Sequence, residues 1–344
     1  MKSSLAARLI PWQREYGRHD LPWQVADPYY VWLSEVMLQQ TQVATVIPYF
    51  LRFIERFPDV ASLAAAAPDD VLAAWSGLGY YSRARNLHRA AQEVMDRFAG
   101  VFPSSPDELA QLPGVGRSTA AAIAAFSFGA NAAILDGNVK RVLTRWAGIS
   151  GWPSEKAVEN RLWQLAESLL PTGNVDAYTQ GLMDLGSLVC TRSKPNCKAC
   201  PLTADCVALA TGQQKLLPTP KPRKALPERH TVLLLIRQAD GRILLERRPP
   251  TGIWGGLWSL PEAADTLSAA ALCQRLFGFD VDFDPAGADF VHVFTHFRLT
   301  ITPLSGRIHQ AGNLADSHTG WFGLAEARAL GLPAPVRRLL DIAQ

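Results

Sequence analysis

The sequence predicts two domains, an all-helical one over residues 1–212 and a smaller one, over 230–344, that mixes helices and strands. In the first region apolar residues recur at helical spacing between short loops. Residues 213–229 are rich in proline and in lysine and arginine, which is typical of a semi-rigid linker. Beyond them the pattern changes to that of β-strands. Since 48% of the 344 residues are hydrophobic, both regions can form a core.

Charge and hydropathy limit the classes of function. The net charge is only +3, so any binding of nucleic acid must rely on local clusters and backbone amides. No segment reaches the roughly 18 continuous apolar residues of a membrane helix, and residues 1–5 lack a signal-peptide core. We therefore expect a cytoplasmic protein without a membrane partner.

A carboxylate stands out in the first apolar helix. Asp27 and Pro28 predict the start of a helix over residues 29–38. Glu35 lies within this otherwise apolar segment, where a buried, unpaired carboxylate is costly and tends to take up a proton. The alternative is a surface glutamate at the helix end. The polar residues 39–42 that follow suit either a solvated helix end or contacts with bases.

Two glycine-containing segments have features of DNA-binding loops. Residues 77–86 combine two glycines, two tyrosines and two arginines, so they can present aromatic faces beside cations. Gly114 and Gly116 form a Gly-x-Gly turn before a helix over 119–128, and such a turn directs N–H groups towards a phosphate. The plain alternatives are a glycine-terminated helix and a tight helix–helix turn. Asp136 then precedes further helices, over about 139–147, 154–170 and 175–189.

Four of the five cysteines fall within residues 190–206, which argues for a metal site in a reducing compartment. They are Cys190, Cys197, Cys200 and Cys206. Four thiolates suit zinc or an iron–sulfur cluster equally on ligand chemistry. Arg192, Lys194 and Lys198 in the same loop can face phosphate, and the isolated Cys273 is expected in a core.

The second domain is predicted to be α+β. Strands are expected at residues 231–237 and 242–248, joined by a hairpin at 239–241. A helix near 267–277 and a strand over 290–301 follow. The segment 267–278 contains no aspartate or glutamate.

Together these motifs resemble the adenine DNA glycosylases of the MutY type, over nearly the whole chain. The segments that carry the resemblance are 21–23, 32–42, 77–81, 112–119, 135–142 and the four cysteines with their uneven spacing. The implied fold is a helix-hairpin-helix glycosylase domain, with the hairpin at about 109–128 and a [4Fe–4S] loop at 190–206, followed by a Nudix-like domain. Because that domain lacks the acidic metal-binding helix, pyrophosphatase activity is not expected.

The resemblance implies a monomeric enzyme that flips adenine out of duplex DNA and removes it when it is mispaired with 8-oxoguanine or guanine. Glu35 would protonate the leaving base and Asp136 would stabilise the oxocarbenium-like sugar, with Asn138 beside them in the catalytic group. The cofactor would be a [4Fe–4S] cluster on the four cysteines. The implied DNA contacts are Gln24, Leu38, Gln40, Thr41, Tyr80, Gly114, Val115, Gly116, Ser118, Thr295 and His296.

Two positions depart from the related patterns. Ser118 stands where endonuclease III has its lysine nucleophile, so a monofunctional glycosylase is expected. Thr295 replaces the serine of the usual Phe-Ser-His loop, which here reads Phe294-Thr295-His296. The alternatives are an endonuclease III-like glycosylase and lyase acting on oxidised pyrimidines, and an iron–sulfur DNA-binding regulator that would need neither carboxylate.

Overall fold

The computed structural model describes residues 4–222, 225–309 and 318–342, and the chain divides into two compact units. Unit 1 comprises Met1–Ala65 and Asn86–Pro222, and unit 2 comprises Ala66–Arg85 and Arg223–Gln344. None of the helices in the described ranges combines the length and the apolar character needed to cross a membrane.

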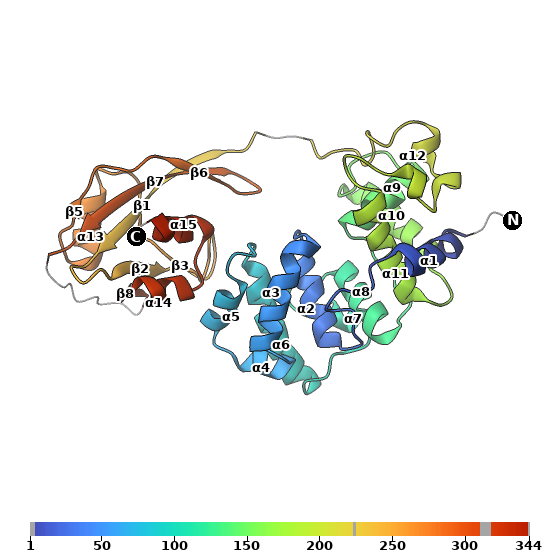
Figure 1. Ribbon diagram of the computed structural model, residues 1–344, viewed down its shortest axis with the longest axis horizontal. Coiled ribbons are helices and arrows are strands. Elements are labelled where there is room, and N and C mark those ends of the chain that lie inside the picture. Colours follow the sequence, from blue (N-terminus) through green and yellow to red (C-terminus); the bar gives the residue numbers. More distant parts are fainter. Residues whose placement is uncertain (1–3, 223–224, 310–317, 343–344) are drawn as a thin grey trace. The chain divides into compact units, whose positions relative to one another are not determined.

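Unit 1 is helical, as predicted (Figure 1). Its helices are α1 (Leu5–Tyr16), α2 (Pro28–Leu38), α3 (Val43–Arg56), α4 (Val60–Ala65), most of α6 (Ser82–Phe98), α7 (Pro106–Leu109), α8 (Arg117–Phe128), α9 (Gly137–Ala147), α10 (Lys156–Ser168), α11 (Val175–Asp184) and α12 (Val207–Ala210). A π-helical turn, η1 (Leu185–Val189), extends α11, and two 3₁₀ turns, η2 (Cys197–Ala199) and η3 (Thr203–Asp205), lie in the cysteine loop. One hydrophobic core joins α1, α8, α9, α10 and α11.

Helix α2 is apolar on nearly every face and is therefore enclosed by its neighbours. The predicted start is confirmed, since the Asp27 carboxylate accepts the Tyr29 N–H at 2.9 Å. Trp32 is fully buried and packs against Phe102, with ring centroids 5.3 Å apart. Glu35 is thus carried by a helix with little solvent-exposed surface.

The helix-hairpin-helix consists of α7, α8 and the turn between them. Gly114 has a φ of +79°, in the left-handed region that favours glycine, and an added Cβ would lie 2.8 Å from the Asn86 Cβ. Helix α8 ends at Gly129, whose φ of +66° forms a left-handed cap. The left-handed backbone and the close approach of Asn86 therefore both require glycine at position 114.

Unit 2 contains an eight-stranded mixed sheet with the strand order β3-β2-β1-β7-β5 and three strands paired off this path. Its strands are β1 (Glu228–Arg237), β2 (Ile243–Arg247), β3 (Trp258–Ser259), β4 (Glu262–Ala263), β5 (Asp282–Phe283), β6 (Phe290–Val293), β7 (Arg298–Arg307) and β8 (Thr319–Phe322), and its helices are α5 (Pro68–Trp75), α13 (Ala269–Phe277), α14 (Leu324–Ala329) and α15 (Ala334–Ile342). Strands β1 and β7 pair in parallel over ten residues. Helix α13 packs on the sheet through Phe277 and Cys273, which is fully buried, as predicted.

The strand structure expected over residues 290–301 is present, but a turn divides it into β6 and β7. The two strands pair in antiparallel register with Val293 opposite Arg298. The Phe294 N–H donates to the Phe297 carbonyl at 2.9 Å, which places Thr295 and His296 at the tip of a tight hairpin. This tip has no glycine, asparagine or proline, so the usual sequence signal for a turn is missing.

Residues 66–85 belong to unit 2 although they precede its sheet by more than 100 positions in the chain. The Tyr81 hydroxyl donates to the Leu332 carbonyl at 3.0 Å. The Arg85 guanidinium donates to the Gly255 carbonyl at 2.6 Å. These long-range contacts were not foreseen because each depends on residues that are isolated in the sequence.

Candidate active site

A cavity of about 510 Å³ in unit 1 is the main candidate for a base-binding pocket. Glu35 and Leu38 of α2 line one side of it, and Gln24 lines another. Gln24 also holds its own loop, because its side chain accepts the Leu21 N–H at 3.0 Å and donates to the Arg18 carbonyl at 2.8 Å. The cavity thus brings together three of the residues predicted to act on DNA.

Glu35 is held in its neutral form. Burial, and to a smaller extent the nearby negative charge of Asp136, raise the pKa of this carboxyl from 4.5 to about 8. Below that pH the group carries a proton that it can donate. Glu35 is half-buried on the cavity wall, so the structure disfavours the alternative of a glutamate exposed at the helix end.

Asp136 is the N-cap of α9, and its Oδ1 accepts the Val139 N–H at 2.7 Å. Burial raises the pKa of its carboxyl, while backbone N–H groups and the cations Arg141 and Lys140 oppose that increase. The N–H groups at the start of α9 thus favour the ionised form of Asp136, although burial is the largest influence on its pKa. The N–H donors and cations around Asp136 favour its charged form. That negative charge raises the pKa of Glu35, so a single proton shared by the two carboxyl groups belongs on Glu35.

Asn138 lies next to Asp136, with its side chain directed towards Arg141. The Arg141 guanidinium donates to the Asn138 Oδ1 at 2.7 Å, to the Gly186 carbonyl at 2.6 Å and to the Cys190 carbonyl at 2.7 Å. Asn138 and η1 pack closely, since a Cβ on Gly186 would lie 2.6 Å from the Asn138 Cβ. One arginine thus connects the turn that carries Asp136 to the first cysteine of the loop.

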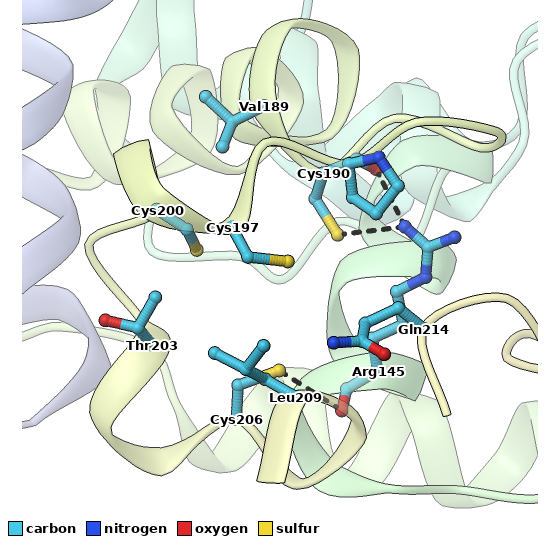
Figure 2. Close-up of a pocket in the computed structure, with 10 residues that line it drawn as sticks. Arg145, Val189, Cys190, Cys197, Cys200, Thr203, Cys206, Leu209 and Gln214 are labelled. Atoms are coloured by element: carbon cyan, nitrogen blue, oxygen red, sulfur yellow. Dashed lines mark hydrogen bonds between the residues drawn. The ribbon is translucent and has the colours of Figure 1, made fainter. Parts of the chain in front are cut away.

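The four clustered cysteines line a second, smaller cavity of about 30 Å³. Figure 2 shows their sulfur atoms arranged around this common space. Burial raises the pKa of the Cys200 thiol to about 11 and also raises that of Cys206. Within the described ranges, no group of three or more His, Cys, Asp and Glu residues is arranged to hold a single metal ion.

Arg145 was missed as a functional candidate, although it organises the cysteine loop. It is 3% exposed, and it donates to the Cys190 sulfur at 3.4 Å and to the carbonyls of Thr191 at 2.7 Å and Arg192 at 3.0 Å. It also donates to the Leu217 carbonyl at 2.8 Å. The available signal was its spacing of four residues from Arg141, which puts both arginines on one face of α9.

Asp184 was also missed. It is fully buried and accepts hydrogen bonds from the Arg18 backbone N–H at 2.9 Å, from the Arg18 guanidinium at 2.7 Å and from Gln180 at 2.9 Å. Because Arg18 and Gln180 both line the large cavity, Asp184 fixes two of its polar groups. The spacing of Gln180 and Asp184 by four residues was the only sequence signal.

The residues predicted to contact DNA in the helix-hairpin-helix differ in whether their polar groups are already hydrogen-bonded within the protein. The Val115 N–H donates to the Leu112 carbonyl at 3.0 Å, so this amide already has an acceptor within the turn. Gly116 is the N-cap of α8, and the first amides of that helix have no acceptor within the helix. The Ser118 hydroxyl accepts the Leu135 N–H at 2.9 Å and thus braces the segment before Asp136.

The remaining predicted contacts lie on loops. Gln40 and Tyr80 have φ values of +58° and +48°, a left-handed conformation that is uncommon for residues other than glycine. Gln40 and Thr41 follow the C-terminus of α2, in unit 1. Tyr80 is 45% exposed and belongs to unit 2, as do the exposed Thr295 and His296.

Comparison with protein families gives the class of this fold and site. Residues 33–168 match the model of the HhH-GPD superfamily of base excision DNA repair proteins, and residues 232–341 match the model of a NUDIX domain. A solved structure of a thermostable thymine-DNA glycosylase is similar, with a TM-score of 0.54 and 27% identity, covering 60% of this chain and 95% of that one. The molecule is thus a helical base-excision repair glycosylase with a C-terminal Nudix-like domain.

The chain belongs to the adenine DNA glycosylase family. It is 37% identical to the adenine DNA glycosylase of Buchnera aphidicola subsp. Acyrthosiphon pisum, a match that covers 97% of this chain and 95% of the relative. The human adenine DNA glycosylase is 35% identical over 85% of this chain and 65% of its own length. Members of this family are base-excision repair enzymes that hydrolyse the N-glycosyl bond of adenine in DNA.

Proposed function

We propose that this enzyme excises adenine mispaired with 8-oxoguanine or guanine in duplex DNA, as a monomer, with Glu35 as its general acid. The observation that carries the proposal is the position of Glu35 on the wall of the 510 Å³ cavity. Burial and the nearby Asp136 carboxylate raise the pKa of Glu35 there, which favours its protonated form. A base inside a duplex cannot reach this cavity, so it must first be flipped out, at a cost of a few kcal/mol. The cavity then receives the flipped adenine.

Glu35 would give its proton to a ring nitrogen of the bound adenine. The glycosidic bond then breaks with its electron pair on the base, which departs neutral rather than as an anion. The sugar becomes an oxocarbenium-like cation. Asp136, held by the N–H groups of α9, would stabilise this cation, and water then adds to the anomeric carbon and loses a proton.

The family comparison and the cysteine cavity together support a [4Fe–4S] cluster on Cys190, Cys197, Cys200 and Cys206. Such a cluster is held by four cysteine thiolates, and the sulfur atoms of these four cysteines surround one cavity. When bound, the cluster would hold the 190–206 loop in order.

Replacement of Cys200 by serine should give protein that lacks iron and the brown colour of the wild type. We also expect DNA affinity to fall by about tenfold, because the basic residues of the loop lose their fixed positions. Iron and sulfide analysis with a DNA titration measures both effects. Cys273→Ser is the matched control, since Cys273 lies in the core of unit 2 and should leave the iron content unchanged. Colourless wild-type protein with one zinc per chain would contradict the proposed cluster.

Single-turnover base release from duplexes that pair adenine with 8-oxoguanine, guanine, cytosine or thymine tests the proposed substrate. We expect the rate to be highest opposite 8-oxoguanine, followed by guanine. Thr295→Ala with His296→Ala should reduce the preference for 8-oxoguanine over guanine by about tenfold, because both side chains are exposed at the hairpin tip. An unchanged preference in the double variant would remove this tip from lesion reading.

Introducing a lysine at position 118 tests the monofunctional assignment. Ser118→Lys should form some borohydride-trappable complex and nick the strand, without faster base release. The variant also loses the hydrogen bond to the Leu135 N–H, at a cost of about 1 kcal/mol in stability. Ser118→Ala isolates that cost, because it loses the same bond without gaining an amine. Trapped complex with the wild type would show that the enzyme already has a lyase nucleophile.

A further inference from the structure

The loop between β2 and β3 contains a tryptophan with a strained backbone that the proposed mechanism does not use. Trp254 has a φ of +57°, which is rare for a residue with a bulky side chain. Two hydrogen bonds within the loop stabilise its conformation. The Leu257 N–H donates to the Trp254 carbonyl at 3.0 Å, and the Gly256 N–H donates to the Pro249 carbonyl at 3.0 Å. The Arg85 guanidinium holds its other side through the Gly255 carbonyl. Such strain persists only where the surroundings fix the conformation.

The conformation directs the indole of Trp254 towards the β6–β7 hairpin. The side chain is 9% exposed, and its ring lies 5.8 Å from Phe294 and 6.1 Å from His292, measured between centroids. Both partners belong to the strand and turn that lead to Thr295 and His296. The tryptophan therefore packs against β6 and the first residue of the turn that follows it.

A second aromatic ring, that of Phe297, supports the turn immediately before β7. Phe297 is fully buried and stacks on Phe294 with centroids 4.4 Å apart and an interplanar angle of 16°. The imidazole of His296 meets the same ring edge-on at 4.7 Å, and the Arg229 guanidinium lies 4.7 Å from its centroid. Thr295 and His296 therefore project from an aromatic base composed of Trp254, Phe294 and Phe297.

We propose that Trp254 is a positioning residue for the hairpin tip and so contributes to discrimination between 8-oxoguanine and guanine. The inference rests on the proposed role of Thr295 and His296 in reading the lesion. A tip of two exposed residues has many side-chain conformations, and each one that is lost on binding costs affinity. Packing Phe294 between Trp254 and Phe297 removes part of that freedom in advance.

The test compares Trp254→Ala with Trp254→Phe in single-turnover excision of adenine opposite 8-oxoguanine and opposite guanine. Trp254→Ala should lower the ratio of the two rates by about threefold to tenfold, the size expected for loss of an aromatic pair, while the rate opposite guanine stays near that of the wild type. Trp254→Phe keeps a ring against Phe294 and should restore most of the ratio. Equal losses on both substrates, or an unchanged ratio, would overturn the proposal.

A matched control and a double variant separate positioning from a general loss of stability. Trp321 is a tryptophan of the same unit that packs on Phe279 in the sheet core. Trp321→Ala should lower the melting temperature and leave the ratio unchanged. Because Trp254 acts through the tip, adding Trp254→Ala to the Thr295→Ala, His296→Ala variant should reduce the ratio no further, and an additional loss would contradict this. The Thr295→Ala, His296→Ala variant alone tests lesion reading. A normal ratio there would refute the proposed role of the tip, whereas a loss there with a normal ratio in Trp254→Ala would refute only the inference on Trp254.

Discussion

Glu35→Gln should lower the single-turnover rate of adenine release by at least ~10²–10⁴-fold, the usual contribution of a general acid. Glutamine keeps the shape of the side chain but cannot deliver the proton, so affinity for the mispaired duplex should persist. Rapid-quench assays and a binding titration measure the two quantities separately. Glu55→Gln is the matched control, because Glu55 is exposed on α3 and should turn over normally. Near-normal turnover by Glu35→Gln would remove this carboxyl from the mechanism.

The pH dependence of the same pair of proteins gives an independent test. Burial places the pKa of Glu35 at about 8, so the wild-type rate should fall as pH rises through that value. Glu35→Gln should lack this alkaline decrease. Since the pKa is raised above its ordinary value of 4.5, the stabilising contribution of the protonated carboxyl is complete below about pH 4.5 and lost as pH rises through about 8. Glu35→Gln should therefore gain stability relative to the wild type between pH 5 and pH 9, by an amount on the order of a few kcal/mol.

Asp136→Asn should slow base release by roughly 10²–10³-fold, as expected when one preorganised electrostatic partner of the transition state is removed. Asparagine is as good an N-cap as aspartate, so α9 should remain intact and the melting temperature should change little. Loss of the negative charge should also lower the pKa of Glu35, because Asp136 helps to raise it. The alkaline decrease in rate should then begin at a lower pH.

Asp136→Ala distinguishes the two roles of this residue. It loses both the charge and the hydrogen bond to the Val139 N–H, and should cost about 1 kcal/mol in stability that Asp136→Asn retains. Thermal unfolding of the two variants measures that difference. Full activity in Asp136→Asn would show that the developing sugar cation is stabilised by another group.

Local signals in the sequence were sufficient for most of the fold. Asp27 and Pro28 set the start of α2, the Gly-x-Gly turn precedes α8, and the change from helical to alternating periodicity separates the two kinds of structure. These features depend on residues within a few positions of one another. The loop between β6 and β7 was expected only from the family resemblance, because no local sequence signal specifies a turn there and Phe294 instead packs on Phe297.

The candidate site was only partly predictable for the same reason. The composition around Glu35 suggested burial but left a surface position open, and only the packing of α2 decides between them. The protonation of Asp136 depends on how much protein covers it, which no local pattern records. Arg145 and Asp184 gain their roles from partners up to 166 residues away.

The bonds of Arg145 have a consequence for how the molecule opens locally. The same guanidinium holds the cysteine loop and the Leu217 carbonyl, and two residues later the Thr219 hydroxyl accepts the Gly151 N–H at 3.1 Å. The loop and the chain segment that leaves unit 1 should therefore exchange their amide hydrogens as one cooperative group. Loss of the proposed cluster would then alter the protection of the Gly151 amide and of the chain segment that leads out of unit 1.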